Sequence, residues 1–388
     1  MVSSKLPRVL ILTAGYGEGH HSAARGVAEA LAGKAECRVM DVCQETMPRM
    51  FKLTRDAYLW VISQAPGLWR ALYDWSDRID LSQTGAGVLI GVEHHLDATL
   101  QEWRPDVVVS TYMLYPYMLD RLATNGKKCA MSVNPLSINH LRVPYVTVVT
   151  DSIVINKSWV CSQSDLWCVT DAQTKAVMEQ RGVPSDRIEV TGFPVSLSLS
   201  SLPAGRGDTW VSGQEFRVLY FAQGSPKKAA ADLLALLSAR GDVHVTCILG
   251  HRFRKVYPHI RALRQVYGHR LVVRGWTTRV PNYLADHHVV VGKAGGATVH
   301  EVLAAKRPML IHYLLPGQEE GNLELLEYLK VGEYVPNSQG LRDALLRLMA
   351  REGQVWRQMR KALEDANMTG GARAVAEFAL KLISPACK

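Results

Sequence analysis

The sequence predicts an α/β fold built from two Rossmann-like domains, and three observations lead to this prediction. The chain has 388 residues, which is the size of two ordinary domains rather than one. Short runs rich in β-branched residues alternate with helical patterns along the whole chain, as in proteins with parallel sheets. A stretch rich in Ser, Gly and Pro, residues 196–213, separates two such series and carries little to bury. We therefore predict domains at 1–196 and 197–388, joined by a linker in this stretch.

Eleven segments are candidate strands, because each is short, apolar and rich in β-branched residues. Those of the first domain lie near residues 9–13, 37–42, 106–110, 145–150, 166–169 and 188–190. Those of the second lie near residues 217–221, 244–249, 271–274, 288–291 and 308–312. Small residues predict a helix over 23–31, and helical periodicity marks 356–382. As a terminal helix, this last segment could pack on either domain.

Composition excludes several classes of protein. Hydrophobic residues make up 47% and charged residues 21%, which excludes a disordered chain and a coiled coil. No apolar run reaches the roughly 18–20 residues that cross a bilayer. The first residues lead into a strand without the apolar core of a secretory signal, so we expect a cytoplasmic protein. The seven cysteines are scattered, without the spacing of a zinc site, and we expect them to be reduced.

The charge balance points to an anionic partner. Lys and Arg total 45 against 36 Asp and Glu, a formal net charge of +9. Such a balance suits nucleotide phosphate, nucleic acid or an acidic membrane surface, and composition alone does not choose among them.

The first motif runs from Thr13 to Ser22, between the first strand and the helix that follows it. Its glycines, at 15, 17 and 19, permit a tight turn close to a ligand, and the helix start offers free N–H groups to an anion. A histidine at a helix N-terminus is biased toward the neutral imidazole, which can accept a proton. His20 is therefore a candidate general base, with His21 second. The same loop could also be an ordinary turn with surface histidines.

The second motif, Gly292 to Glu301, again joins a strand to a helix. Gly295, Gly296 and the hydroxyl of Thr298 lie where a diphosphate would meet amide donors. Glu301 follows about one turn later and could accept ribose hydroxyls, or it could simply stabilise its own helix dipole. A third motif, Leu315 to Asn322, gathers an amide and carboxylates that suit the hydroxyls of a sugar. Taken alone it is only a polar loop.

Together the motifs resemble those of glycosyltransferase family 28, over residues 8 to about 350. The residues that carry the resemblance are Gly17-Glu-Gly-His20 with Ala23-Ala24, Thr150-Asp151, Gly182-Val-Pro184, Val190 to Val195, Lys293 to Glu301, and Pro316-Gly-Gln-Glu319 with Asn322. Within the family, their order resembles monogalactosyldiacylglycerol synthase and the bacterial processive diacylglycerol glucosyltransferases. The chain departs from the family pattern at Tyr112, Asn156 and the loop 222–226.

This resemblance implies a GT-B fold, in which two Rossmann-like domains face each other across a cleft. It implies that 1–196 binds the acceptor and 197–388 the UDP-sugar. In the first domain, the residues carried over are the catalytic candidates His20 and Asp151, with Gly17, Gly19 and His21 in the loop. In the second they are Gly295, Gly296, Ala297 and Thr298 for the diphosphate, Glu301 for the ribose, and Gln318, Glu319 and Asn322 toward the donor sugar.

The reaction expected from the resemblance is inverting transfer of a hexosyl unit from a UDP-sugar to a lipid hydroxyl, most simply that of diacylglycerol. The chain has no Asp-x-Asp metal motif, and no metal or other cofactor is expected. Three alternatives stay open: a transferase of the lipid II type that uses UDP-N-acetylglucosamine, a soluble-acceptor glycosyltransferase, and a non-catalytic protein that binds nucleotide sugar or lipid. The motifs also resemble, more distantly, UDP-N-acetylglucosamine 2-epimerase. The sugar and the oligomeric state are not determined by the sequence.

Residues 47–80 suggest a membrane contact. Aromatic side chains that tolerate the headgroup region, among them Trp60, Trp69 and Trp75, are interleaved with cations such as Arg55. This predicts a peripheral protein on the inner face of the cell membrane. The alternative is a buried helical pair with its aromatic residues in a core.

A second basic feature lies between Asp242 and Asp286, which enclose no acidic residue. Eight arginines and lysines accumulate there, at positions 252, 254, 255, 261, 264, 270, 274 and 279. A solvated face, capture of UDP and contact with anionic lipid would each account for them. No nucleic-acid-binding module accompanies this charge, so we expect no nucleic-acid partner.

Overall fold

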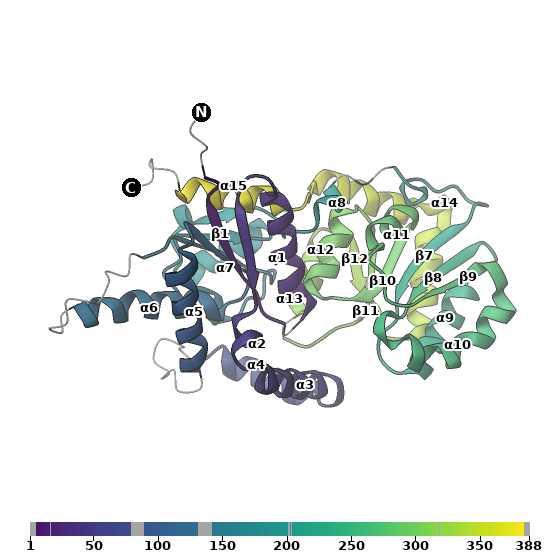
Figure 1. The fold of residues 1–388 in the computed structure, drawn as a ribbon. Helices are drawn as coiled ribbons and strands as arrows, with labels where there is room; N and C mark the ends of the chain where they lie inside the picture. The colour runs from purple at the N-terminus through teal and green to yellow at the C-terminus, as the bar shows by residue number, and fades with distance from the viewer. Residues whose placement is uncertain are drawn as a thin grey trace. The chain divides into compact units, whose positions relative to one another are not determined.

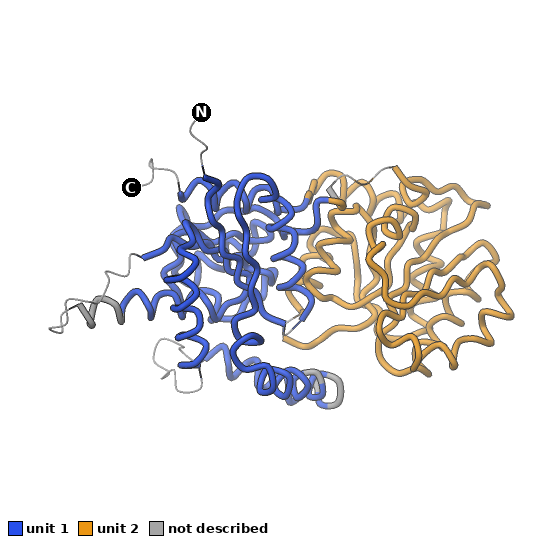
Figure 2. Tube along the Cα trace, viewed as in Figure 1, with its two compact units in different colours: residues 1–197, 370–388 blue, residues 198–369 orange. Residues whose placement is uncertain are grey.

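The computed structural model describes residues 5–15, 17–78, 89–130, 142–200, 202, 204–317 and 319–383. Contacts divide the chain into two compact units, shown in blue and orange in Figure 2. Unit 1 is Met1–Leu197 with Gly370–Lys388, and unit 2 is Ser198–Thr369. The division falls one residue from the boundary expected between 196 and 197.

Unit 1 contains a six-stranded parallel sheet in the order β2-β1-β3-β4-β5-β6 (Figure 1). Its strands are β1 (Arg8–Leu12), β2 (Glu36–Met40), β3 (Val107–Ser110), β4 (Tyr145–Val148), β5 (Leu166–Val169) and β6 (Ile188–Val190). Each lies within two residues of a predicted strand. The order reverses between β1 and β3, because the chain turns back past β1 after β2.

Helices cover both faces of this sheet. They are α1 (Glu18–Leu31), α2 (Val42–Thr46), α3 (Pro48–Gln64), α4 (Pro66–Ser76), α5 (Ile90–Trp103), α6 (Leu114–Ala130), α7 (Ala172–Gln180) and α15 (Ala372–Ile383), with α8 (Leu197–Ser200) at the unit boundary and the short turns η2 (Lys157–Val160) and η3 (Ser185–Arg187). Alternate residues of β1 enter different cores. Val9 and Ile11 pack with α1 and α15, whereas Leu10 and Leu12 pack with α5 and α6.

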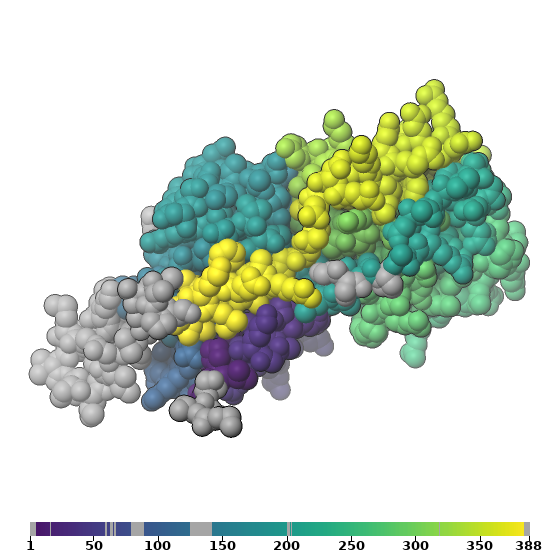
Figure 3. Space-filling model, turned by 90° about the horizontal axis from the view of Figure 1, so that it is seen from above, coloured from purple at the N-terminus to yellow at the C-terminus, as the bar shows by residue number. Residues whose placement is uncertain are grey.

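The C-terminal helix α15 lies against α1 in unit 1, and Figure 3 shows its yellow surface beside the purple N-terminal segment. A side chain at Gly371 would meet the carbonyl oxygen of Gly192 at 2.0 Å, so only glycine allows this approach. The segment predicted as one helix over 356–382 is therefore two. The first, α14 (Ser338–Ala366), ends at Asn367 in the left-handed conformation, with φ of 45°. The sequence allows the terminal helix to pack on either domain, and in the structure it packs on unit 1.

Unit 2 contains a second six-stranded parallel sheet, in the order β12-β11-β10-β7-β8-β9. Its strands are β7 (Phe216–Phe221), β8 (Val243–Ile248), β9 (Leu271–Arg274), β10 (Val289–Lys293), β11 (Met309–Tyr313) and β12 (Gly332–Tyr334). Its other helices are α9 (Pro226–Leu237), α10 (Phe253–Tyr267), α11 (Val280–Asp286), α12 (Gly296–Ala304) and α13 (Glu320–Tyr328), with turns η4 (Arg206–Asp208), η5 (Gly250–Arg252) and η6 (Gly268–Arg270). The edge strand β12 was not predicted, since it has three residues and two are Glu and Tyr.

The second half of the predicted linker is a packed part of unit 2. Side chains at Gly205 and Gly207 would lie 2.2 Å and 2.1 Å from the carbonyl oxygens of Ala285 and His287. Trp210, a few residues on, is 3% exposed. The expectation that this stretch carries little to bury is therefore wrong for residues 205–210, because the two glycines let the backbone pack closely against the end of α11 and the residue after it.

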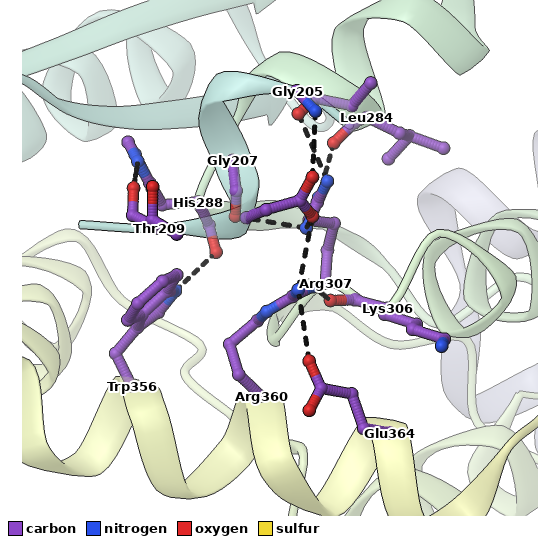
Figure 4. Close-up of polar contacts among 12 residues, drawn as sticks. Gly205, Gly207, Thr209, Leu284, His288, Lys306, Arg307, Trp356, Arg360 and Glu364 are labelled. Atoms are coloured by element: carbon purple, nitrogen blue, oxygen red, sulfur yellow. Dashed lines mark hydrogen bonds and ion pairs between the residues drawn. The ribbon is translucent and has the colours of Figure 1, made fainter. Parts of the chain in front are cut away.

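A buried arginine fastens this segment (Figure 4). Arg307 is 2% exposed, and its guanidinium donates to Leu284 O (2.6 Å), Gly207 O (3.0 Å), Ala285 O (3.1 Å) and Asp208 Oδ1 (2.8 Å). Arg360 of α14 reaches the same carboxylate at 3.2 Å and also donates to the Lys306 carbonyl. The planar guanidinium suits this task, since it offers five donors in a fixed fork. One side chain thus joins the entry of unit 2 to α11.

Candidate functional site

Each sheet has one place where its strand order reverses, and both predicted glycine loops lie there. In unit 1 the reversal separates β1 from β3, and the first loop follows β1. In unit 2 it separates β7 from β10, and the second loop follows β10. Ligands of open α/β sheets bind beyond the carboxyl ends of the strands at such a point. The strand order therefore supports both loops as binding elements, which sequence periodicity could not do.

His20 is buried at the start of α1, with 8% of its surface exposed. Its Nδ1 lies 2.8 Å from the carbonyl oxygen of Thr111, which follows β3, and 3.1 Å from the hydroxyl of Thr150, which follows β4. A carbonyl oxygen only accepts, so Nδ1 carries a proton and donates it to Thr111. The lone pair of the neutral ring is then on Nε2, where a base would need it.

Burial keeps this imidazole uncharged. It lowers the pKa of His20 to about 4, and the hydrogen bond to Thr111 opposes the shift only in part, while His21 adds to it. The sequence predicts the neutral form from the helix N-terminus, and in the structure the largest cause is the loss of solvent around the ring. At neutral pH His20 is therefore ready to accept a proton.

Aromatic rings connect His20 to the second catalytic candidate. Tyr112 stands edge-on to the imidazole at 5.1 Å, and Trp159 lies 6.2 Å from it. The indole Nε1 of Trp159 donates to Asp151 Oδ2 at 2.8 Å. Burial raises the pKa of Asp151 to about 6, and this hydrogen bond limits the rise. The structure thus brings His20 and Asp151 into one cluster, and it gives Tyr112, noted only as a departure from the family, a place against the imidazole.

The remaining residues of the first loop differ in their constraints. The amide of Gly15 donates to Asp41 Oδ2 at 2.8 Å, and a side chain there would lie 3.2 Å from the His21 ring. A side chain at Gly17 or Gly19 would meet open space, so packing within unit 1 does not require glycine at either position. His21 lies 3.3 Å from the hydroxyl of Thr13 and shares none of the contacts described for His20.

The second loop presents a helix N-terminus with a cation above it. Gly295 is the N-cap of α12, and no side chain caps this end. The first-turn amides of Gly296, Ala297 and Thr298 lack carbonyl partners within the helix, as at any helix start. A side chain at Gly295 would lie 2.9 Å from Cε of Lys293, so the lysine extends directly over this end. The arrangement suits a diphosphate.

Glu319 is engaged within unit 2. It is 5% exposed, its Oε1 lies 3.0 Å from Nζ of Lys293, and its Oε2 accepts from the amide of Leu315 at 3.1 Å. The resemblance predicts that this carboxylate contacts the donor sugar. Within unit 2 it also forms an ion pair with Lys293 and so orients that side chain. Glu301 lies in the second turn of α12 and is half-buried.

Asn322 is buried below the same loop. Its Nδ2 donates to Ala294 O at 2.9 Å, and its Oδ1 has no hydrogen-bond partner in the part of the chain that the structure describes. Gln318 lies outside the described residues. Nδ2 of Asn322 therefore stabilises the loop, while Oδ1 is a hydrogen-bond acceptor without a partner among the described residues.

Helices α3 and α4 expose apolar side chains to solvent. Trp60 is 62% exposed, Trp75 61%, Leu53 70% and Leu68 52%. Trp69 instead packs edge-on against Tyr58 at 4.9 Å and is half-buried. Arg55 is half-buried as well, with its guanidinium 3.8 Å from Asp56. The membrane-contact prediction and the buried-pair alternative therefore each fit some residues of this segment. Trp69 packs against Tyr58, whereas Trp60 and Trp75 face solvent.

The C-terminal end of α4 is fastened to the segment that carries Trp159. Asn156 Nδ2 donates to the hydroxyl of Ser76 at 3.0 Å, and the amide of Lys157 donates to Asp77 Oδ1 at 2.5 Å. Asp77 also pairs with Arg181 at 3.0 Å. The exposed helical pair is thus linked, within unit 1, to the cluster around His20 and Asp151. Among the described residues no helix has the length and apolar character to traverse a bilayer.

Comparison with known proteins gives a family match. Residues 20–195 match the family described as monogalactosyldiacylglycerol (MGDG) synthase. This span begins at His20, includes Asp151 and ends at Val195, and so it covers the whole cluster described above. A curated relative, processive diacylglycerol beta-glucosyltransferase of Bacillus subtilis (strain 168), is 24% identical over 380 residues, covering 96% of this chain and 95% of that protein.

Solved structures agree on the fold. MurG of Acinetobacter baumannii superposes with a TM-score of 0.61 at 14% identity, covering 97% of this chain and 99% of that one. A UDP-GlcNAc 2-epimerase from Neisseria meningitidis gives 0.61 at 13% identity, covering 96% and 100%. At such identities the likeness concerns the fold alone, and it confirms the α/β two-domain GT-B class. The resemblance seen in the sequence is thereby confirmed: the chain resembles glycosyltransferase family 28, through a monogalactosyldiacylglycerol synthase match over 20–195 and a likeness to processive diacylglycerol glucosyltransferases over nearly its whole length.

Proposed function

We propose that this protein is an inverting glycosyltransferase that moves a hexosyl unit from a UDP-sugar to a lipid hydroxyl, with diacylglycerol as the acceptor. The observation that carries the proposal is the buried, neutral His20, whose Nδ1 is occupied by Thr111 and whose Nε2 is left with the lone pair. It lies in the segment that matches the monogalactosyldiacylglycerol synthase family. The name of the Bacillus subtilis relative suggests the acceptor.

In this proposal His20 Nε2 takes the proton of the acceptor hydroxyl as the oxygen attacks the anomeric carbon. The bond to the UDP oxygen breaks on the opposite face, so the configuration inverts and UDP leaves. Proton transfer leaves a buried imidazolium at His20. An ionised Asp151, connected to the cluster through Trp159, stabilises this positive charge. His20 is the first candidate for the base and Asp151 the second.

Unit 2 would hold the donor. The amides of Gly296, Ala297 and Thr298 face outward from the start of α12, and Lys293 adds a positive charge above them. These groups would stabilise the charge that grows on the leaving diphosphate, so we propose that transfer needs no added metal. Glu301 is assigned to the ribose, and Gln318 and Glu319 with Asn322 to the sugar.

The test is a panel of radiolabelled UDP-glucose, UDP-galactose and UDP-N-acetylglucosamine, each with diacylglycerol and separately with a polyprenyl-linked acceptor in mixed micelles, with and without EDTA. Transfer of one hexose to diacylglycerol, unchanged by EDTA, is the expected result. Transfer from UDP-N-acetylglucosamine to a polyprenyl-linked acceptor alone would support the lipid II type instead. Epimerised UDP-N-acetylglucosamine with no transfer, or nucleotide binding with no turnover, would overturn the proposal.

The pH dependence of transfer is expected to report on Asp151. Its pKa of about 6 lies above that of His20, about 4, so protonation reaches Asp151 first as the pH falls. We expect kcat/KM to decrease below about pH 6. In Asp151→Asn the remaining activity should instead decrease nearer pH 4, where His20 titrates. Initial rates across pH 3.5–8.5 measure this, and a limb at pH 6 that persists in the variant would exclude Asp151 as its source.

The exposed tryptophans of α3 and α4 are proposed to rest on the membrane that supplies the acceptor, on the inner face of the cell membrane. Trp60→Ser/Trp75→Ser should weaken binding to phosphatidylglycerol vesicles by about tenfold, because interfacial tryptophans lose their favourable place between water and lipid. Flotation at low salt measures it. Tyr328→Ser, on α13 of unit 2 and 62% exposed, serves as the matched exposed-aromatic control. Equal recovery of the double variant and the wild type would exclude α3 and α4 from the membrane contact.

A further inference from the structure

The net positive charge of the protein is concentrated in one part of unit 2. Residues 226–285 contain eleven Lys and Arg and only two Asp, a net charge of +9, which equals the formal charge of the whole chain. The rest of the chain is therefore close to neutral. The excess positive charge therefore raises the electrostatic potential at this part of unit 2, and not over the whole protein surface.

The two acidic residues of this segment do not offset its surface charge. Asp232 is fully buried, and its oxygens accept from the hydroxyls of Tyr220 at 2.8 Å and Ser338 at 2.6 Å. Asp242 is paired with Arg240 at 2.7 Å. The remaining cations thus have little acidic charge among the elements packed beside them.

Helix α10 presents four of these eleven cations to solvent, more than any other element of the segment. It packs on α9 and on β9, the edge strand of the second sheet, through Val256 and Ile260 (Figure 1). Arg254, Lys255 and Arg261 are exposed, and none has a hydrogen bond or ion pair within the described chain. We call Arg254, Lys255, Arg261 and Arg264, with the neighbouring exposed Arg274 and Arg279, the α10 surface.

Apolar side chains border the α10 surface. Val266, near the end of the helix, is 77% exposed, and Trp276, in the loop after β9, is 63% exposed. The indole stacks on the exposed ring of His251 at 5.7 Å and 26°. Single exposed apolar side chains are common on protein surfaces, so Val266 and Trp276 count here only because they lie beside the exposed cations of the α10 surface.

We propose that the α10 surface binds anionic phospholipid headgroups, as a second membrane contact separate from α3 and α4. The four cations of α10 span residues 254–264, about 15 Å of helix, and with Arg274 and Arg279 they match a plane of charges better than a single diphosphate does. Trp276 and Val266 can enter the headgroup layer beside them. The proposal extends the proposed function, because a transferase that takes a lipid acceptor works at such a surface, but it rests on unit 2 alone.

The experiment compares full-length wild type with Arg254→Gln/Lys255→Gln/Arg261→Gln. The matched control is Lys34→Gln/Arg373→Gln/Lys361→Gln, which removes the same charge from exposed positions elsewhere. Partition onto vesicles of phosphatidylcholine with 30 mol% phosphatidylglycerol, and onto pure phosphatidylcholine, is measured by flotation at low and high salt. Both triple variants are also made with Trp60→Ser/Trp75→Ser, so that the α3 and α4 contact is removed independently.

The α10 variant should lose at least tenfold in partition onto the anionic vesicles, in either background, whereas the control loses less than about twofold. Its UDP affinity and its transfer to diacylglycerol in detergent should stay unchanged. Equal partition of the two triple variants would overturn the proposal. So would a matching loss of UDP affinity, which would assign the cations to the donor, or tighter binding of a single-stranded oligonucleotide than of vesicles. If no sugar is transferred at all, the proposed function fails while the vesicle result still stands.

Discussion

Replacing His20 with alanine is expected to lower the rate of sugar transfer by about a hundredfold or more while UDP affinity stays at the wild-type value. The loss follows from removing the atom that receives the acceptor proton, Nε2, which the bond from Nδ1 to Thr111 leaves unprotonated. UDP affinity should persist because the residues assigned to the nucleotide all lie in unit 2. Single-turnover rates and calorimetry with UDP measure the two quantities separately.

The matched control is His21→Ala, the adjacent histidine. His21 contacts the hydroxyl of Thr13 at 3.3 Å and has no part in the cluster around Asp151. We expect it to retain transfer within about tenfold of wild type, since no proton transfer is assigned to it. Near wild-type turnover of His20→Ala would remove His20 from the role of base, and Asp151 would then be tested in its place.

Replacing Arg307 with methionine is expected to destabilise unit 2 by about 3–5 kcal/mol, because three buried carbonyl oxygens lose their hydrogen-bond donor at roughly 1–3 kcal/mol each. Three carbonyl oxygens and the Asp208 carboxylate accept from this guanidinium, which is 2% exposed. Methionine fills similar volume but donates nothing. Arg360 and the amide of Gly205 would still donate to Asp208, so the carboxylate keeps two partners, whereas the three carbonyls lose the guanidinium.

Urea unfolding followed by tryptophan fluorescence measures this effect, because Trp210 and Trp356 are both buried in unit 2. Lys361→Met, at an exposed position of α14, is the matched control and should change stability by less than about 0.5 kcal/mol. Arg307→Lys should recover only part of the loss, since an ammonium cannot reproduce the planar fork. A change below about 1 kcal/mol for Arg307→Met would show that the segment 205–210 is held without this side chain.

The strands were predictable because each is a local pattern. In a parallel sheet covered on both faces, β5 and β9 appear as short apolar runs whose bounds the sequence marks without knowledge of their neighbours. The edge strand β12 has no such run, and it forms because Gly332 and Tyr334 pair with a strand already in place. The pairing with β11 stabilises β12, and the amino-acid composition of β12 does not indicate that pairing.

The site was predictable in part. The glycine loops and His20 belong to motifs that lie close together in the sequence, and their residue types alone suggest anion binding and a base. Tyr112 and Thr111 could not be assigned, since they lie about ninety residues from His20 and contact it only after β1 and β3 pair. Glu319 is a further example: its polar loop suggests a sugar contact, and the ion pair with Lys293 is a contact that only the folded chain adds.

The sequence by itself determined the α/β class, the two series of strands, the loops that follow β1 and β10 and the identity of the candidate base. The tertiary structure alone decided which unit α15 joins, which carbonyls meet Arg307 and which aromatic residues of α3 and α4 face solvent. The reason is physical. Periodicity and turn chemistry act over a few residues, whereas burial, hydrogen-bond partners and the pKa values they set depend on groups that only the folded chain brings together.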